Sequence, residues 1–261
     1  MIPIQREISF SGKAGESGVG DLFLPAGKAT GCPVLLIHSG GWKELDKVNI
    51  EFMVPFFVQA GRSVFNINYR LLGTAPWPAC AEDCMNAAQF VLDGGLASRG
   101  LPAPEKILVC GASAGGHLAM MTGLSLPRER VEAIISLAGP SRLDWIASHR
   151  DPLRMHENLL ENFFGRAVSP DSPEVRAASP AFRAENNPPR LFCLHSSNDQ
   201  VTPPAHAREA KAAWEAQGGR ADITLIDGHG DLHGFWIDNA LGGGLRPEVG
   251  EFIGNALSQL S

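Results

Sequence analysis

The sequence predicts an α/β fold in which a central, mostly parallel sheet of about eight strands is flanked by helices. The first observation is a rhythm: short apolar or β-branched runs alternate with longer segments of helical spacing, as in successive βα units. The second is composition, because 44% apolar and 19% charged residues in a chain of 261 suffice for a buried sheet. No repeat or linker interrupts this pattern, so we expect one domain over residues 1–261.

The expected strands are short, apolar and bounded by turn residues, as buried strands of a parallel sheet are. A Gly/Ser-rich turn separates the first two, which we expect to form a hairpin. The expected strands are 4–10, 20–24, 33–38, 63–68, 106–110, 131–137, 190–195 and 222–226.

Helical spacing follows most of these strands, and two of the segments have proline near the first turn, where its missing N–H costs little. The expected helices are 49–60, 80–92, 114–124, 204–217 and 247–260. One stretch, 141–189, contains several prolines and aromatic residues but no strand pattern. Because a connection of this length is more often a lid or a binding loop than a plain link, we expect a small lid there.

Composition and charge exclude several classes of protein. The net charge is −6 and no basic cluster occurs, so we expect no nucleic-acid partner. No apolar stretch is long enough to span a bilayer, and the first residues lack a signal-peptide pattern, so we expect a cytoplasmic protein without a membrane span. The cysteines are scattered and odd in number, and we interpret them as small core residues. They are Cys32, Cys80, Cys84, Cys110 and Cys193.

The motif Gly-Ala-Ser-Ala-Gly at 111–115 is the strongest chemical signal. It follows an expected strand and opens an expected helix, which is the setting of a nucleophile elbow. Small neighbours allow a turn so sharp that the hydroxyl of Ser113 stands clear of the sheet. The five-residue string alone is weak, and the alternative is a serine that caps a helix after a glycine turn. In its strand–turn–helix setting, it predicts Ser113 as a nucleophile.

A second glycine turn, His-Ser-Gly-Gly-Trp at 38–42, follows the strand expected at 33–38. Glycines free the backbone N–H groups to point at a substrate oxygen, so Gly40 and Gly41 are candidates for an oxyanion hole. The N–H of Ala114, at the start of the elbow helix, would complete it. The alternative is a plain tight turn.

A serine nucleophile needs a general base and an acid that orients the base; after such an elbow the acid comes first in the chain. Asp199 lies just beyond the strand expected at 190–195, at the edge where catalytic residues of open α/β sheets gather. His233, before the last helix, is the favoured base, and His229 is the alternative. Asp227 and Asp231 are less favoured as the acid because they are too near these histidines in sequence.

Aromatic residues in the loops that should surround the site predict an apolar rim suited to a small acyl group or a sugar face. The candidates for this substrate pocket are Trp42, Trp145 and Phe235, and the alternative is that they belong to the core.

The remaining histidines show no spacing typical of a metal site, so we expect no metal. His117, one turn into the elbow helix, is expected to form only local hydrogen bonds. The histidines in question are His117, His149, His156 and His206.

Together these residues resemble the hormone-sensitive-lipase-like branch of the α/β hydrolases, particularly small carbohydrate (acetyl and feruloyl) esterases and the kynurenine formamidases. The resemblance spans most of the chain. It departs from the family at Ser39, where glycine is usual. The matching motifs are the turn at 38–42, Asn-Tyr-Arg-Leu at 68–71, Trp-Pro-Ala at 77–79 before the helix with Asp83, 111–118, Ala-Ser-Pro at 178–180, Pro-Pro-Arg-Leu at 188–191, Asp-Gln-Val at 199–201 and His-Gly-Phe at 233–235.

The resemblance implies an α/β-hydrolase fold with a lid at 141–189, no cofactor and a small-molecule ester substrate. It is compatible with a monomer or a homodimer. Two other functions remain open: an arylformamidase, which would cleave an N-formylkynurenine-type amide with the same triad, and a non-catalytic ligand-binding homologue. The second is disfavoured because such proteins usually lack a member of the triad, and here all three are present.

Overall fold

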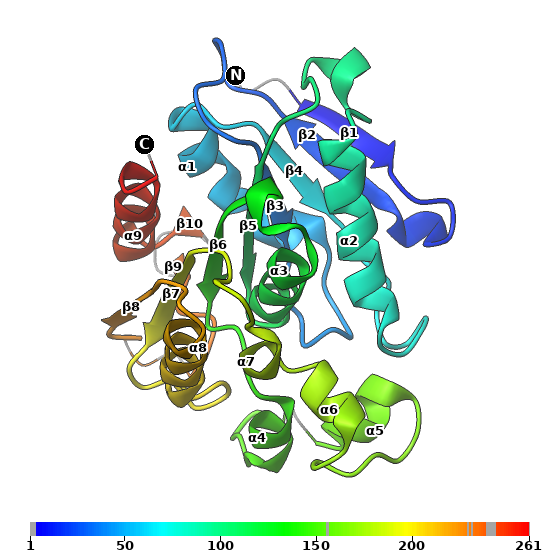
Figure 1. Ribbon diagram of the computed structural model, residues 1–261, viewed down its shortest axis with the longest axis vertical. Coiled ribbons are helices and arrows are strands. Elements are labelled where there is room, and N and C mark those ends of the chain that lie inside the picture. Colours follow the sequence, from blue (N-terminus) through cyan, green and yellow to red (C-terminus); the bar gives the residue numbers. More distant parts are fainter. Residues whose placement is uncertain (1–3, 155–156, 229, 231, 239–243, 261) are drawn as a thin grey trace.

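The computed structural model describes residues 4–154, 157–228, 230, 232–238 and 244–260. One eight-stranded sheet crosses the molecule in the order β1-β2-β4-β3-β5-β6-β7-β8 (Figure 1). The β1–β2 and β2–β4 pairs are antiparallel and the other pairs are parallel, so the predicted hairpin and mostly parallel sheet are confirmed. The strands are β1 (Ile4–Ser9), β2 (Val19–Phe23), β3 (Val34–Ile37), β4 (Val64–Ile67), β5 (Ile107–Ala112), β6 (Val131–Leu137), β7 (Leu191–Ser196) and β8 (Ala221–Ile226).

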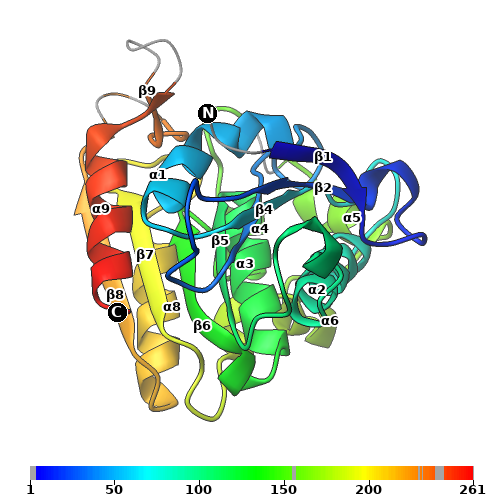
Figure 2. The ribbon, with the colours of Figure 1, turned by 90° about the horizontal axis from the view of Figure 1, so that it is seen from above.

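Helices cover both faces of the sheet, which is why its central strands are continuous apolar runs. On β3, Leu35 and Ile37 belong to a core cluster with side chains of α2, α3 and α8, whereas Val34 and Leu36 belong to a second cluster with α1 and α9. The two groups of helices lie on opposite sides of the sheet (Figure 2). They are α1 (Val54–Gln59), α2 (Ala79–Leu92), α3 (Ala114–Ser125), α8 (Ala205–Ala216) and α9 (Pro247–Ser258).

The helix predicted over 49–60 is wrong in detail, because two short elements share that stretch. A 3-10 helix, η2 (Lys47–Met53), leads into α1. Pro55 lies in the first turn of α1 and has no N–H to donate, so continuous α-helical bonding cannot run through it. The N–H of Val54 donates instead to the carbonyl of Glu51, three residues back. The other four predicted helices agree with α2, α3, α8 and α9 to within two residues at each end.

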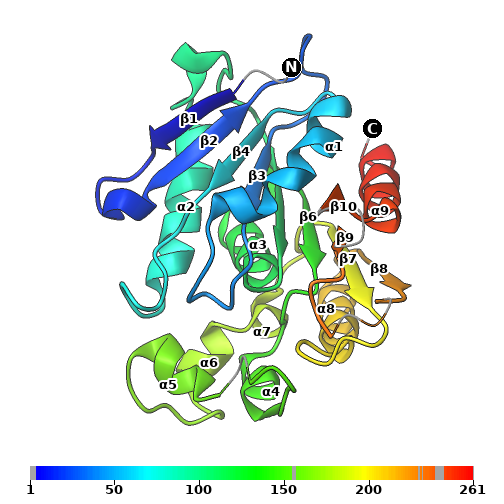
Figure 3. The same ribbon diagram turned by 180° about the vertical axis from the view of Figure 1, so that it is seen from behind.

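In its described part, the 141–189 segment contains four short helices and no strand. Most of the segment lies beyond one end of the sheet (Figures 1 and 3). The carbonyl of Phe163 accepts a hydrogen bond of 2.7 Å from the N–H of Trp77 and ties the segment to the loop before α2. The helices are α4 (Leu143–Ser148), α5 (Leu159–Phe164), α6 (Pro173–Ala177) and α7 (Pro180–Arg183). A two-stranded ribbon, β9 (Ile237–Asp238) and β10 (Gly244–Leu245), precedes α9.

The five cysteines are free thiols. Four of them are buried, as predicted, but Cys32 is only half-buried because it lies in the loop before β3 and not within the strand. Within the part of the chain that the structure describes, no helix combines the length and apolarity needed to cross a membrane.

Candidate active site

Ser113 lies between β5 and α3 in a sharp turn with backbone angles φ +53° and ψ −120°. A positive φ is costly for any residue with a Cβ, and it persists only where the surroundings enforce it. Here the N–H of Ser113 donates to the carbonyl of Leu137 on β6 at 2.7 Å, and its own carbonyl accepts from the N–H of His117 at 3.0 Å. The serine is 8% exposed.

The glycines on either side of Ser113 permit this turn. A Cβ on Gly111 would lie 2.2 Å from the carbonyl oxygen of Gly115, and a Cβ on Gly115 would lie 2.2 Å from the carbonyl oxygen of Ile37 on β3. Both collisions are with backbone, which cannot move aside without disturbing the sheet. Positions 111 and 115 therefore require glycine, because the backbone of another segment lies against each of them.

The three side chains predicted as a triad lie together, although Ser113, Asp199 and His233 are far apart in sequence. His233 Nε2 is 2.8 Å from Ser113 Oγ, and His233 Nδ1 is 2.8 Å from Asp199 Oδ2. Because a carboxylate can only accept, Nδ1 carries the ring hydrogen, and the lone pair of Nε2 faces the serine hydroxyl. The side chain of His233 is 10% exposed and that of Asp199 is fully buried.

The carboxylate of Asp199 is oriented by backbone donors. Its Oδ1 accepts hydrogen bonds from the N–H groups of Val201 at 3.0 Å and Thr202 at 2.8 Å, which leaves Oδ2 for His233. The next residue, Gln200, donates its N–H to the carbonyl of Leu232 at 2.8 Å. That bond joins the loop of the acid directly to the loop of the histidine.

A second histidine, which the sequence analysis did not single out, lies behind the acid. His195 on β7 donates Nε2–H to the carbonyl of Thr202 at 2.7 Å, and the same nitrogen is 3.8 Å from Asp199 Oδ2. Burial lowers the pKa of His195 to about 4, against the attraction of Asp199, so the ring is neutral at pH 7. Its position immediately before Ser196-Ser197-Asn198-Asp199 was the only available signal.

The predicted oxyanion residues form a tight turn after β3. Gly40 and Gly41 have φ of +110° and +56°, and the carbonyl of Gly40 accepts hydrogen bonds from the N–H groups of Lys43 and Glu44. A Cβ on Gly40 would lie 1.9 Å from the carbonyl oxygen of Glu44. Among the described residues, no acceptor occupies the N–H groups of Gly40 and Gly41. Ala114 is the first residue of α3, where an N–H has no partner within the helix.

An aromatic stack supports the start of this turn. The rings of His38 and Tyr69 lie 4.1 Å apart and nearly parallel, and the Tyr69 hydroxyl is 3.2 Å from the carbonyl oxygens of both His38 and Ser39. The carbonyl of Ser39 also accepts a 2.7 Å hydrogen bond from His38 Nδ1. Burial lowers the pKa of His38 to about 4, so this ring is neutral as well.

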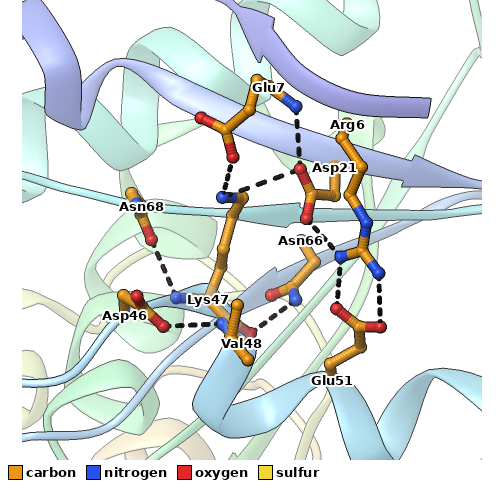
Figure 4. Close-up of polar contacts among 9 residues, drawn as sticks. All are labelled: Arg6, Glu7, Asp21, Asp46, Lys47, Val48, Glu51, Asn66 and Asn68. Carbon is orange, nitrogen blue, oxygen red and sulfur yellow. Dashed lines mark hydrogen bonds and ion pairs between the residues drawn. The ribbon is translucent and has the colours of Figure 1, made fainter. Parts of the chain in front are cut away.

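A polar cluster anchors the far end of the turn, where η2 begins (Figure 4). Both backbone groups of Lys47 are bound by asparagines: its N–H donates to Asn68 Oδ1 at 2.8 Å and its carbonyl accepts from Asn66 Nδ2 at 2.7 Å. The Lys47 ammonium forms ion pairs with Glu7 and Asp21, which lie on the two antiparallel strands β1 and β2. The glycine turn is thus held between this cluster and the end of β3.

The predicted substrate pocket needs correction. Trp42 and Phe235 are 1% and 0% exposed, and each packs in one of the two core clusters, so neither offers an open face to a substrate. Sequence could not separate core from rim here, because both residues follow glycine turns in which either direction is possible. Trp145, on α4, is 38% exposed, with the Arg142 guanidinium over its ring, and stays a prediction. Trp236 packs edge-on against the His233 ring, at 5.1 Å between centroids.

The remaining predictions for this region concern the alternative residues His229 and Asp231 and the contacts of His117. His229, the alternative base, and Asp231 lie outside the described residues. His117 was expected to bond only locally, and that is wrong. Its ring contacts Trp42, 75 residues away, and the carbonyl of Ala178, 61 residues away.

The sheet order, the strand–turn–helix elbow and the helices on both faces define the α/β-hydrolase fold. Within that class, the chain belongs to the BD-FAE family, whose model matches residues 20–213.

Curated relatives agree with this membership. Esterase LipQ of Mycobacterium tuberculosis is 27% identical over 259 residues, which cover 93% of this chain and 60% of that protein. Hormone-sensitive lipase of Bos taurus is 28% identical over 156 residues, which cover 54% of this chain and 20% of that protein. The chain therefore spans 60% or less of the length of these two relatives.

Solved structures share the fold. Esterase B from Lactobacillus rhamnosis superposes with a TM-score of 0.80 at 18% identity, covering 99% of this chain and 85% of that one. A truncated carbohydrate esterase from gut microbiota gives a TM-score of 0.75 at 21% identity, covering 87% and 88%. At these identities the likeness concerns the fold.

Proposed function

We propose that the protein is a serine hydrolase that cleaves a small carboxylic ester through an acyl-enzyme. The observation that carries this proposal is the unbroken chain of two 2.8 Å contacts from Ser113 Oγ through His233 to Asp199 Oδ2. A serine hydroxyl is a weak nucleophile, and a neutral imidazole with its lone pair on that hydroxyl is the arrangement that activates it. Relatives named as esterases support the choice of an ester.

In the proposed cycle, Ser113 Oγ attacks the ester carbonyl while its proton passes to His233 Nε2. Asp199 holds the resulting imidazolium. The negative charge on the substrate oxygen is stabilised by the N–H groups of Gly40, Gly41 and Ala114. Collapse of this intermediate breaks the C–O bond, and His233 returns the proton to the leaving alcohol. A water molecule, deprotonated by the same histidine, then attacks the acyl-enzyme and releases the acid and the free serine.

We further propose that residues 1–261 form one hydrolase domain and that the 141–189 segment is its lid. The segment contributes the exposed ring of Trp145. Most of the segment lies beyond one end of the sheet (Figure 3). A lid with an exposed aromatic ring suits an acyl group or a sugar face.

The test is a substrate panel on the purified protein: p-nitrophenyl esters of increasing acyl length, acetylated sugars, a feruloyl ester and N-formylkynurenine. We expect hydrolysis of a short ester, and a loss of kcat of about 10⁴-fold to 10⁶-fold in Ser113→Ala. The matched control is Ser125→Ala, an exposed serine at the end of the same helix, which should keep wild-type kcat. Faster turnover of N-formylkynurenine than of any ester would reassign the protein as an arylformamidase. An unlabelled Ser113 after fluorophosphonate treatment would refute a serine hydrolase altogether.

A further inference from the structure

His117 is a buried imidazole that the proposed chemistry does not use. It lies one turn after Ser113 on α3 and is 0% exposed. Its Nε2 is 2.8 Å from the carbonyl oxygen of Ala178, and its Nδ1 is 3.2 Å from the indole Nε1 of Trp42. A carbonyl can only accept and an indole N–H can only donate. The ring of His117 is therefore neutral. Its hydrogen is on Nε2, and the lone pair of Nδ1 accepts the indole N–H of Trp42.

Trp42 is the residue on which the glycine turn ends. It directly follows Gly40 and Gly41, and with φ +61° it is the third consecutive residue in the left-handed region. That conformation is unfavourable for a residue with a side chain. Such a residue stays there only if its side chain is held, and a shift of the indole changes the direction of the preceding N–H groups.

Three contacts hold Trp42. Its indole Nε1–H donates to His117 Nδ1 at 3.2 Å, and the two rings meet edge-on at 5.2 Å. The ring of Phe163, from the 141–189 segment, also meets the indole edge-on at 5.2 Å. The backbone carbonyl of Trp42 accepts a 2.9 Å hydrogen bond from the N–H of Leu72. Among these, the bond to His117 Nδ1 is the one that fixes the rotation of the indole about its own axis, because ring packing is less directional than an N–H···N bond.

We propose that His117 is a positioning residue for the oxyanion turn: by accepting the indole N–H of Trp42, it sets the N–H groups of Gly40 and Gly41 relative to Ser113. This inference rests on the proposed function, since an oxyanion hole has meaning only for acyl transfer. Because His117 lies on the same helix as the nucleophile, this one side chain aligns the oxyanion turn with Ser113. Burial lowers its pKa to about 4, which keeps the lone pair available at neutral pH.

The two nitrogens of His117 can be replaced separately. In His117→Asn, the amide oxygen lies near the place of Nδ1 and can accept from Trp42, but nothing reaches Ala178. In His117→Gln, the amide N–H reaches Ala178, but no acceptor faces Trp42. Trp42→Phe removes the indole donor and keeps a ring in the core. The matched control is Trp214→Phe, because Trp214 is equally buried, donates its Nε1–H to the Pro189 carbonyl at 2.7 Å and lies on α8.

The measurements are kcat and KM for p-nitrophenyl acetate, Ki for a trifluoromethyl ketone that forms a tetrahedral adduct on the serine, and Tm. In Trp42→Phe and His117→Gln we expect kcat to fall and Ki to rise together by about tenfold to a hundredfold, with KM within twofold of wild type. The double variant should lose no more than either single one, because both remove the same bond. His117→Asn should restore most of kcat, and Trp214→Phe should lower Tm alone.

Four results would overturn the proposal. Trp42→Phe could match Trp214→Phe in kcat, which would make His117 merely structural. The asparagine and glutamine variants of His117 could lose kcat equally. That result would show that accepting the Trp42 N–H is not what matters at this position. A rise in KM without a fall in kcat would make Trp42 a substrate contact. A wild-type protein without esterase activity or fluorophosphonate labelling would refute the proposed function itself, a result that none of the other three produces.

Discussion

The two halves of the candidate site are built by different means. Around Ser113 the structure is fixed by backbone meeting backbone, at Gly111 and Gly115, with strands β3 and β6 on either side. Around His233 the chain is a loop without regular structure, held by side-chain packing and by one backbone hydrogen bond to the loop of the acid. Phe235 is fully buried in the core below, and Trp236 packs against the imidazole.

This difference shows how position is encoded in each half. The nucleophile is held in place because Gly111 and Gly115 have no side chains, which is a local property of five consecutive residues. The base is placed by contacts with residues distant in sequence, such as the hydrogen bond from the Gln200 N–H to the Leu232 carbonyl. A side chain added at Gly111 or Gly115 should therefore act on folding, whereas a change in the histidine loop should act on orientation and rate.

In the histidine half of the site, the largest effect is expected at the acid that orients the base. In Asp199→Asn, the amide can present an N–H to His233 Nδ1, which moves the ring hydrogen to Nε2 and leaves no lone pair for Ser113. We expect kcat/KM for p-nitrophenyl acetate to fall roughly 10⁴-fold while Tm changes little. The matched control is Asp227→Asn, an exposed carboxylate in the histidine loop, which should keep wild-type kcat/KM. A large loss in the control and none at Asp199 would assign the acid to Asp227.

The sequence predicted the fold and the elbow because both depend on local patterns. Apolar runs mark strands that are buried on both faces, and Gly111 and Gly115 have neighbours that leave no room for a Cβ. The order of acid and base after the serine, together with the place of Asp199 beyond a strand and of His233 before the last helix, led to the choice of Asp199 and His233.

The sequence could not predict contacts that depend on how loops fold back. The partner of His117 lies 75 residues away, and no periodicity points to Trp42. Trp42 and Phe235 were assigned to a pocket because they lie in loops expected to surround the site, yet a place in a loop does not decide whether a ring faces core or solvent. His195 was missed for a similar reason, since its part in the acid's surroundings follows from the return of the chain at Thr202.

A pair of glycine substitutions compares how much the elbow and the histidine loop each contribute to stability. In Gly115→Ala the new Cβ would lie 2.2 Å and 2.4 Å from the carbonyl oxygens of Ile37 and His38, so the backbone must shift, at a cost of about 3 kcal/mol or more. Gly234 has φ +71°, but among the described residues no atom lies within 4 Å of where its Cβ would be, so Gly234→Ala should cost only about 1 kcal/mol. Urea unfolding measures both free energies. Equal losses would mean that the elbow is no more constrained than the histidine loop.

The dependence of stability on pH also divides between two parts of the site. His38 and His117 lie beside the oxyanion turn and His195 lies behind the acid, and burial lowers the pKa of each to about 4. In the unfolded chain these rings have a pKa near 6.5, so below that pH the unfolded state binds more protons. Stability is therefore complete above pH 6.5 and is lost as the pH falls toward 4, by about 2 kcal/mol for each histidine at pH 5.

The measurement is the free energy of unfolding in urea at pH 7, 6 and 5. His195→Gln separates one contribution, because the amide N–H can still donate to the carbonyl of Thr202 while the side chain no longer titrates. Its loss between pH 7 and pH 5 should be smaller than the wild-type loss by about 2 kcal/mol. His38 and His117, beside the oxyanion turn, still contribute to the pH dependence of this variant, because burial lowers the pKa of both. A variant with the full wild-type pH dependence would show that His195 is not held neutral by burial.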